Sequence, residues 1–290
     1  MIIFCQTKRR WRYLSFVLGL VILLWWVVYL SLPSGVLTVF FLDIGQGDAI
    51  LIEAPNGNQM LIDGGRGGQI LSRLSQIMPW FDRSLDLVIA THPDADHIGG
   101  LAAVFNSYQV SQTIDPGKDS STQTYNTYQR LIASKDIPNI VACRGLKIIL
   151  DYGVEFTILS PIREVAALET NEASIVGRLQ YGHNTLLLTG DMPNNIEQDL
   201  IYRGLTSDLR ADILKVGHHG SKNSSSLPFL QAVRPHYAVI SVGATNSYGH
   251  PSPIVLERLK GLNIPTLRTD QLGTVVFTSD GVTFRLHQAL

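Results

Sequence analysis

Four side chains able to bind a metal ion lie within six residues of one another: His92, Asp94, Asp96 and His97. They follow a mostly apolar run at residues 85–89, which predicts a buried strand, so all four lie on a loop that leaves a strand end. Buried without a cation, two carboxylates would repel each other and two imidazoles would need other partners. A pair of divalent cations removes both costs, and we predict a metal site here. The alternative is a solvated acidic turn that caps the next helix, with Asp96 near the N-cap.

Two later segments place further candidate ligands just after apolar strands. Asp191 ends the run Leu188-Thr189-Gly190-Asp191, where a carboxylate can bridge two cations. Its alternative is an N-cap for the helix that Pro193 opens. His218 and His219 follow another apolar strand and are flanked by glycines, which permit close approach of the backbone to an ion. We expect His218 to be the ligand and His219 to support the site or to donate a proton.

Polar residues near these segments are candidates for substrate contact. Lys215 and Ser221 flank the histidine pair and suit an anionic substrate, although Lys215 also fits the polar face of its strand. A further candidate set precedes a helical pattern: Asn246, Tyr248 and His250. The alternative to substrate contact is that these residues only form an ordinary loop. Three other carboxylates are expected to hold loops by accepting backbone N–H groups rather than to bind metal: Asp43, Asp48 and Asp63.

Strands and helices must alternate to position these residues. The pattern after residue 35 predicts two β-rich layers, each covered by helices, with polar residues gathered at the strand ends. The predicted strands include residues 36–42, 49–53, 60–62, 86–90, 110–114, 174–180, 185–189, 213–216 and 238–242. The predicted helices include residues 70–77, 101–105, 125–133, 193–202 and 254–259.

The first 35 residues differ from the rest. Residues 13–32 carry no charge and, as a helix, span about 30 Å, the thickness of a bilayer core. The basic residues of the segment 1–12 precede this run, which by the positive-inside rule places 1–12 in the cytoplasm and 36–290 outside the cell membrane. A cleaved signal peptide is the alternative. The run is long for one and lacks a clear cleavage site, so we favour an uncleaved single-pass anchor.

Charge and cysteine content limit the function further. The four basic residues before residue 13 leave 19 basic against 24 acidic residues over 36–290, a formal charge of −5. Such a domain has no bulk attraction for nucleic acid, but two bound divalent cations would add about +4 locally. Cys5 and Cys143 give neither a disulfide framework nor a zinc-ribbon spacing, so the metal ligands must be nitrogen and oxygen.

Taken in order, these motifs resemble the metallo-β-lactamase superfamily, specifically the hydrolase domain of ComEC-type DNA-uptake proteins. The resemblance implies an α+β fold, a four-layer αββα sandwich preceded by one transmembrane helix, with a two-metal site at the rim of the sheets. The motifs that carry it lie over residues 36–290: Phe41-Leu42-Asp43-Ile44-Gly45-Gln46-Gly47-Asp48, Asp63-Gly64-Gly65, His92-Pro93-Asp94-Ala95-Asp96-His97, Thr189-Gly190-Asp191, His218-His219-Gly220-Ser221 and Tyr248-Gly249-His250-Pro251.

The resemblance also implies a ligand set, with two departures. Asp94 stands where the superfamily motif has a second His, and the mid-chain His is missing, its place taken by an amide or hydroxyl of Asn171 or Ser174. The implied first site is His92, Asp94, Asp191 and Asn171. The implied second site is Asp96, His97, Asp191 and His218. An oxygen-rich first site binds Zn²⁺ less tightly and suits Mn²⁺ or Mg²⁺.

We therefore predict a membrane-anchored, metal-dependent hydrolase that cleaves phosphodiesters, with a DNA strand outside the cytoplasmic membrane as its substrate. In this prediction Asp96 orients the attacking water, and His219 is a candidate proton donor. One alternative is hydrolysis of a small ester, lactone or thioester. Another is a non-catalytic module that docks on a DNA-uptake apparatus.

Overall fold

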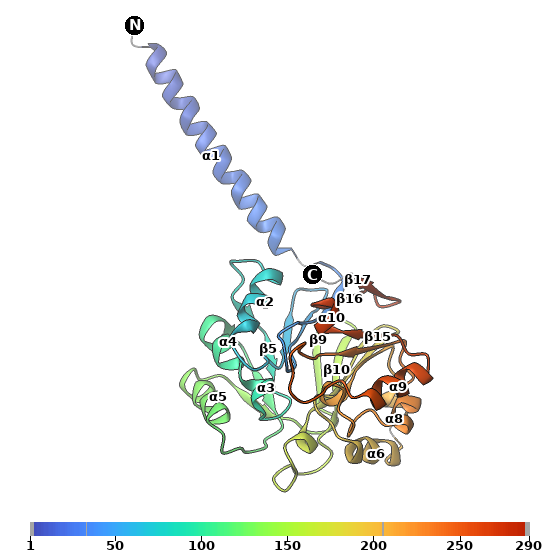
Figure 1. Ribbon diagram of the computed structural model, residues 1–290. Helices are drawn as coiled ribbons and strands as arrows, with labels where there is room; N and C mark the ends of the chain where they lie inside the picture. Colours follow the sequence, from blue (N-terminus) through green and yellow to red (C-terminus); the bar gives the residue numbers. More distant parts are fainter. Residues whose placement is uncertain (1–2, 33, 205, 288–290) are drawn as a thin grey trace. The chain divides into compact units, whose positions relative to one another are not determined.

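The computed structural model describes residues 3–32, 34–204 and 206–287, and the chain separates into two units, Met1–Ser34 and Gly35–Leu290. The first unit holds the helix α1 (Ile3–Ser31), in which Arg9–Tyr29 is long and apolar enough to cross a membrane (Figure 1). Residues 1–2 of the predicted basic segment lie outside the described residues. The predicted roles of residues 1–12, 13–32 and 36–290 stay predictions.

Two mixed sheets form the centre of the second unit. Among the described residues one sheet has the order β17 (Phe284–His287), β16 (Val275–Ser279), β1 (Leu37–Phe41), β2 (Ile50–Glu53), β3 (Gln59–Ile62), β5 (Leu87–Ile89), β7 (Thr113–Asp115) and β8 (Asn139–Val141). The other has the order β15 (Thr266–Arg268), β14 (Tyr237–Ile240), β13 (Ile213–Lys215), β12 (Asn184–Leu188), β11 (Val176–Tyr181), β10 (Val154–Ser160) and β9 (Lys147–Asp151). A short pair, β4 (Ser84–Leu85) and β6 (Gln109–Val110), lies apart from both.

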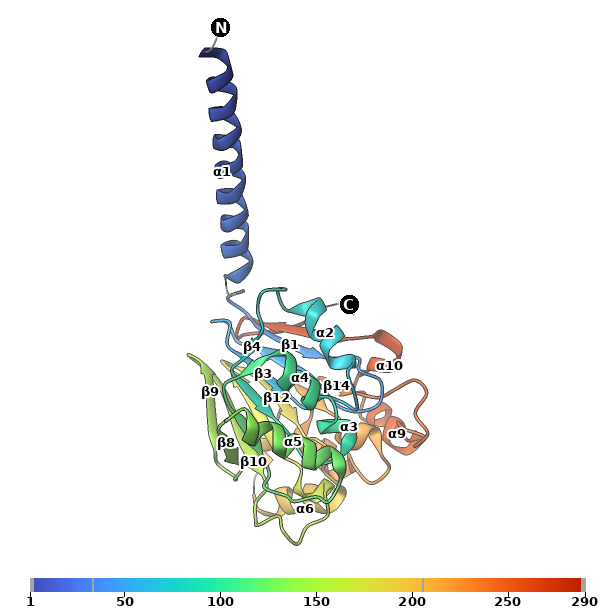
Figure 2. The same cartoon turned by 90° about the vertical axis from the view of Figure 1, so that its left-hand side faces the viewer.

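Helices cover the outer face of each sheet. Figure 1 shows one group on the β5 side of the sandwich, and Figure 2 shows the same group facing the viewer: α2 (Gln69–Ile77), α3 (Ala95–Ile98), α4 (Leu101–Ser107) and α5 (Gln123–Ser134). The other sheet is covered by α6 (Asn194–Tyr202), α8 (Leu227–Val233) and α9 (Pro253–Gly261). Short turns complete the unit: η1 (Asn171–Ala173), α7 (Thr206–Leu209), η2 (Gly217–Gly220) and α10 (Thr269–Leu272).

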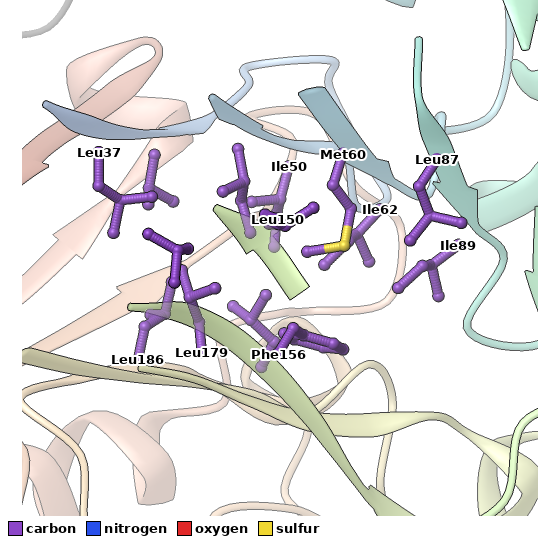
Figure 3. Packing of buried hydrophobic residues seen from close by; sticks show 14 of the residues in the cluster. Leu37, Ile50, Met60, Ile62, Leu87, Ile89, Leu150, Phe156, Leu179 and Leu186 are labelled. Atoms are coloured by element: carbon purple, nitrogen blue, oxygen red, sulfur yellow. The ribbon is translucent and has the colours of Figure 1, made fainter. Parts of the chain in front are cut away.

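Strand periodicity explains the four layers. On β1, Leu37, Val39 and Phe41 pack between the two sheets, whereas Phe40 faces the helices on the outer side. Side chains from both sheets meet in the central layer, and Figure 3 shows Met60 and Ile62 of one sheet opposite Phe156 and Leu179 of the other. Both faces of the inner strands are buried, so strands such as β1 and β5 are buried throughout, whereas the edge strands β8, β9 and β17 carry exposed residues. The predicted α+β, four-layer αββα sandwich is confirmed.

Parallel pairing brings particular strand ends to the site. β3, β5 and β7 run parallel in one sheet, and β12, β13, β14 and β15 run parallel in the other. The carboxyl ends of neighbouring parallel strands lie at one edge of a sheet, so the loops that follow them are neighbours. Two strand predictions were too coarse, because residues 110–114 divide between β6 and β7, and β11 begins at Val176 rather than residue 174.

The central layer predicts a large effect of Phe156→Ala. This side chain is 1% exposed and packs among residues of both sheets, so truncation should lower the free energy of unfolding by about 3–5 kcal/mol. Thermal unfolding of the full chain in detergent, followed by circular dichroism, measures the change. Ile149→Ala on the adjacent strand β9 is the control, because Ile149 is 64% exposed. Equal effects of the two substitutions would contradict this account of the core.

Candidate metal centre

The predicted ligands lie together on loops that follow parallel strands. His92 and His97 come after β5, Asp191 after β12, and His218 and His219 after β13. The ligand atoms of His92, His97 and Asp191 lie within 4.8 Å of one another, and so do those of Asp96, His97 and His219. The structure therefore brings together in one cluster the loop that carries His97, Asp191, which lies 94 residues further along the chain, and His219, which lies 122 residues further.

His97 is held in a single orientation by Asp63. Its Nδ1 donates to Asp63 Oδ2 at 2.7 Å, and Thr91 donates to the same carboxylate through its backbone N–H and its Oγ1. Nε2 of His97 then faces Asp191 Oδ1 at 3.3 Å. Burial lowers the pKa of His97, but the charges of Asp191 and Asp63 outweigh burial and raise it well above the usual value. A carboxylate behind one ring nitrogen prepares the other nitrogen to bind a metal.

His92 faces the same space as a neutral imidazole. Its Nδ1 lies 3.0 Å from Thr91 Oγ1, and its Nε2 lies 3.7 Å from Asp94 Oδ2. Burial, together with the charge of His97, lowers the pKa of His92 to about 3. A neutral ring whose Nε2 carries a free lone pair is the form of histidine that binds metals.

The two adjacent histidines differ in burial but both reach Asp191. His219, which we expected to support the site, is buried, donates from Nδ1 to Ser241 O at 2.9 Å, and places Nε2 3.5 Å from both Asp96 Oδ2 and Asp191 Oδ2. Burial lowers the pKa of His219, but the charge of Asp191 and the interaction with Asp48 raise it to about 9. His218, the expected ligand, lies on the open side of the cluster, with 29% of its side chain exposed and Nε2 3.6 Å from Asp191 Oδ2.

Lys215 is a correction to the predicted substrate contacts. Its side chain is 0% exposed, and its Nζ forms an ion pair with Asp48, donates to Gly190 O at 2.9 Å and lies 3.7 Å from Asp191 Oδ1. Burial lowers the pKa of Lys215, but Asp48 and Asp191 outweigh burial and raise it. A lysine enclosed in this way cannot reach a bulky substrate. Asp48 thus supports the cluster, through a buried cation and not through backbone N–H groups as predicted.

The two residues at the position of the missing mid-chain histidine have different partners. Ser174 Oγ accepts from the backbone N–H of Asp191 at 3.2 Å, so its hydroxyl orients Asp191. Asn171 Nδ2 lies 3.4 Å from His218 Nδ1, and its buried Oδ1 has no hydrogen-bond partner among the described residues. Asp94 is partly exposed and accepts from Thr170 Oγ1 at 3.4 Å.

The remaining predicted contacts lie at the rim of the cluster. Asn246 bonds within its own loop, donating to Gly243 O and His250 O and accepting from His250 N, so it shapes that loop. Ser221 is buried and donates its backbone N–H to His218 O. Tyr248 is 56% exposed and stacks on His250, the ring centroids 5.9 Å apart. Of these residues, Tyr248 is the most accessible to a substrate.

The donor set fits divalent cations. Several buried polar atoms have no hydrogen-bond partner among the described residues, and they converge on one space: Nε2 of His92, His97 and His219, and Oδ1 of Asp191. Unpartnered buried donors and acceptors are rare in folded proteins unless a ligand or ion satisfies them. Imidazole nitrogens and carboxylate oxygens are ligands for zinc and manganese. The identity and number of the cations stay predictions.

Comparison with known proteins agrees with the fold and the motifs. Residues 42–244 match the metallo-beta-lactamase superfamily. ComE operon protein 3 of Bacillus subtilis is 31% identical over 82% of this chain, and Competence protein ComA of Neisseria gonorrhoeae is 32% identical over 85%. This chain spans only about a third of their length, 32% and 33%. These matches confirm the resemblance to ComEC-type proteins that the motifs indicated.

A solved structure supports the fold alone. Igni18, described as a novel metallo hydrolase from the archaeon Ignicoccus hospitalis, superposes with a TM-score of 0.55 at 16% identity. The superposition covers 83% of this chain and 98% of Igni18. This chain and Igni18 therefore share the four-layer fold. Their sequence identity is too low for the role of a side chain in one to be assigned to the other.

Asp63→Asn should weaken metal binding without removing a predicted ligand. The amide cannot accept the proton of His97 Nδ1 as a charged carboxylate does, so we expect the affinity for Mn²⁺ or Zn²⁺ to fall about 10- to 100-fold. Isothermal titration calorimetry on the full chain measures it. The control is Asp136→Asn, an exposed position whose φ of 52° suits asparagine. Unchanged affinity in Asp63→Asn would show that this carboxylate does not prepare His97.

Lys215→Met tests whether this lysine is structural. The substitution keeps most of the volume but leaves Asp48 buried without its cation, so unfolding free energy should fall by about 3–5 kcal/mol. Adding Asp48→Asn removes the stranded charge and should restore a large part of the loss, as measured by thermal unfolding. A Lys215→Met protein of normal stability whose only defect is a raised KM would favour substrate contact instead.

Proposed function

The chain belongs to the metallo-β-lactamase superfamily, and from this premise we propose that it is a membrane-anchored, metal-dependent phosphodiesterase that cleaves a DNA strand outside the cytoplasmic membrane. The superfamily assignment and the ComEC-like motifs support a hydrolase domain of the kind found in competence proteins. The phosphodiester substrate, the anchoring and the place in DNA uptake are the parts that we propose.

The position of Asp191 is the observation that carries the proposal. One of its oxygens lies within 4.8 Å of a ring nitrogen of His92, and its Oδ2 lies 3.5 Å from His219 Nε2. The carboxylate therefore stands between ligand atoms on both sides, as a carboxylate shared by two cations must. The charges of His219 and His97 outweigh the effect of burial and hold the pKa of Asp191 well below its usual value, so the residue is ionised.

The geometry suggests which residues hold each cation. We assign His92, Asp94 and Asp191 to one ion, with Asn171 as a further oxygen donor. We assign Asp96, His97, Asp191 and His219 to the other, so that His219 replaces His218 in the predicted set. Divalent cations held there supply Lewis acidity, which lowers the pKa of water and offsets the negative charge of a phosphodiester.

His218 and Asp96 then contact the substrate and the water on the open side of the cluster. Asn171 Nδ2 donates toward His218 Nδ1, which places the hydrogen of the neutral ring on Nε2, where it can donate a hydrogen bond to a substrate oxygen. Burial lowers the pKa of His218, which keeps the ring neutral near pH 7. Asp96 is partly exposed and orients the attacking water by accepting a hydrogen bond from it.

The candidate membrane helix and the similar proteins indicate where the chain would act and in which process. The helix α1 provides the candidate span, and the basic residues before it favour a cytoplasmic N-terminus, which places residues 36–290 outside the membrane. Similarity to a competence protein favours DNA as the substrate during its uptake. It also favours the uptake machinery as a binding partner. The formal charge of −5 on residues 36–290 favours the second candidate, a small ester, lactone or thioester.

Cleavage assays separate these candidates. The full chain, stripped of metal with EDTA and refilled with Mn²⁺, Mg²⁺ or Zn²⁺, is incubated with single- and double-stranded DNA and with a small lactone. We expect DNA cleavage that returns with metal and falls at least about 100-fold in Asp96→Ala, because the loss of a carboxylate empties one ion site. Asp136→Asn is the control. If elemental analysis shows bound metal but no DNA is cut, the nuclease hypothesis is overturned. Hydrolysis of the lactone under the same conditions would then support the second candidate.

A further inference from the structure

A polar groove adjoins the cluster and is built by the same loops. Its lining includes Gln46, which precedes Gly47-Asp48, and Arg66, which follows Asp63-Gly64-Gly65. The third side is the loop 243–248, which leads to His250. Because each of these loops also carries a residue of the cluster or its rim, a chain-like substrate held in the groove would reach the cluster directly.

One cation in the groove has no acidic partner. Arg73 is engaged by Asp43, at 3.2 Å from Oδ2, and Asp270 is engaged by Arg268 at 2.6 Å. Arg66 is exposed and forms no ion pair with any residue in the described part of the chain. Its guanidinium is therefore open to an anion, and guanidinium groups bind phosphates through paired N–H donors.

Gln46 adds a donor that no protein group uses. Its Oε1 accepts from the backbone N–H of Gly243 at 3.2 Å, which fixes the amide plane. Its Nε2 is buried and has no hydrogen-bond partner among the described residues. An amide N–H donor left unpartnered in this way loses free energy until a ligand oxygen accepts from it.

An exposed aromatic ring lies between the groove and the cluster. Tyr248 lines the groove and stacks on His250 at an interplanar angle of 19°. The ring of His250 lies 5.6 Å from that of His218, which reaches Asp191. A row of rings thus leads from the groove to the cluster. The open face of Tyr248 can stack an unpaired base, a contact that every base can make.

We propose that this groove binds a single DNA strand beside the cleavage position, with Tyr248 stacking one base, Arg66 binding a phosphate, and Gln46 donating to a further oxygen of the strand. The choice of DNA rests on the proposed function. Stacking requires an unpaired base, so the groove selects single strands over duplex. Stacking also explains how an acidic domain could bind DNA, because it does not need a broad basic surface.

Strand binding without cleavage tests this groove. Fluorescence anisotropy follows a labelled ten-residue oligothymidylate binding to the full chain in detergent, with EDTA present. Arg66→Gln should weaken binding about five- to tenfold and reduce the slope of log K against log salt by about 0.7, the value for one lost phosphate contact on a single strand. Tyr248→Leu should weaken it about tenfold with an unchanged slope, and Tyr248→Phe should keep the affinity because it keeps the ring.

Arg203→Gln is the matched control, because Arg203 is an exposed arginine at the C-terminal end of α6. The proposal is overturned if Arg66→Gln and Tyr248→Leu bind as Arg203→Gln does, or if the native chain does not bind the strand at low salt. Cleavage is scored separately. If binding depends on the groove residues but no phosphodiester is cut, only the proposed function is rejected. If the chain cuts DNA but neither substitution changes strand binding, only the groove proposal is rejected.

Discussion

Several carboxylates of like charge lie together at one end of the sandwich. In a medium of low polarity they repel each other, and the surrounding structure must compensate for this repulsion. Asp48, Asp63 and Asp191 are all buried. Lys215 neutralises Asp48 from beneath, and the hydrogen bonds from Thr91 and His97 satisfy Asp63. What remains is the space around Asp191, whose Oδ1 has no hydrogen-bond partner among the described residues, and cations fit there.

The sandwich supplies the rigidity that this arrangement needs. The loops are short and follow strands packed on both faces, so small shifts of backbone are costly. Gly47 shows how close the approach is, because a Cβ at this position would lie 2.0 Å from the carbonyl oxygen of Asp96 and the φ is 124°. The segment that carries Asp48 and the loop that carries Asp96 are therefore fixed against each other by a residue without a side chain.

Sequence reasoning found the layers and the segments of the site, but it could not orient neighbouring side chains. The one-sided spacing of His92, Asp94 and Asp96 and the apolar strands were enough to predict a metal loop. Sequence reasoning could not tell which of His218 and His219 is the more buried, because both adopt positive φ values, 49° and 53°, that no regular strand or helix pattern predicts. A lysine within the apolar strand β13 did carry a usable signal, since a buried ammonium requires a buried carboxylate.

The acidic charge of the domain does not oppose a polyanionic substrate once its location is considered. Five of the 24 acidic residues belong to the cluster and its support: Asp48, Asp63, Asp94, Asp96 and Asp191. Two bound divalent cations would contribute about +4 at that place, which offsets most of the formal −5 of residues 36–290. A phosphate approaching the rim would then meet cations at close range, while the rest of the surface stays unattractive to nucleic acid. Such a distribution favours a strand delivered to the site over DNA collected from solution.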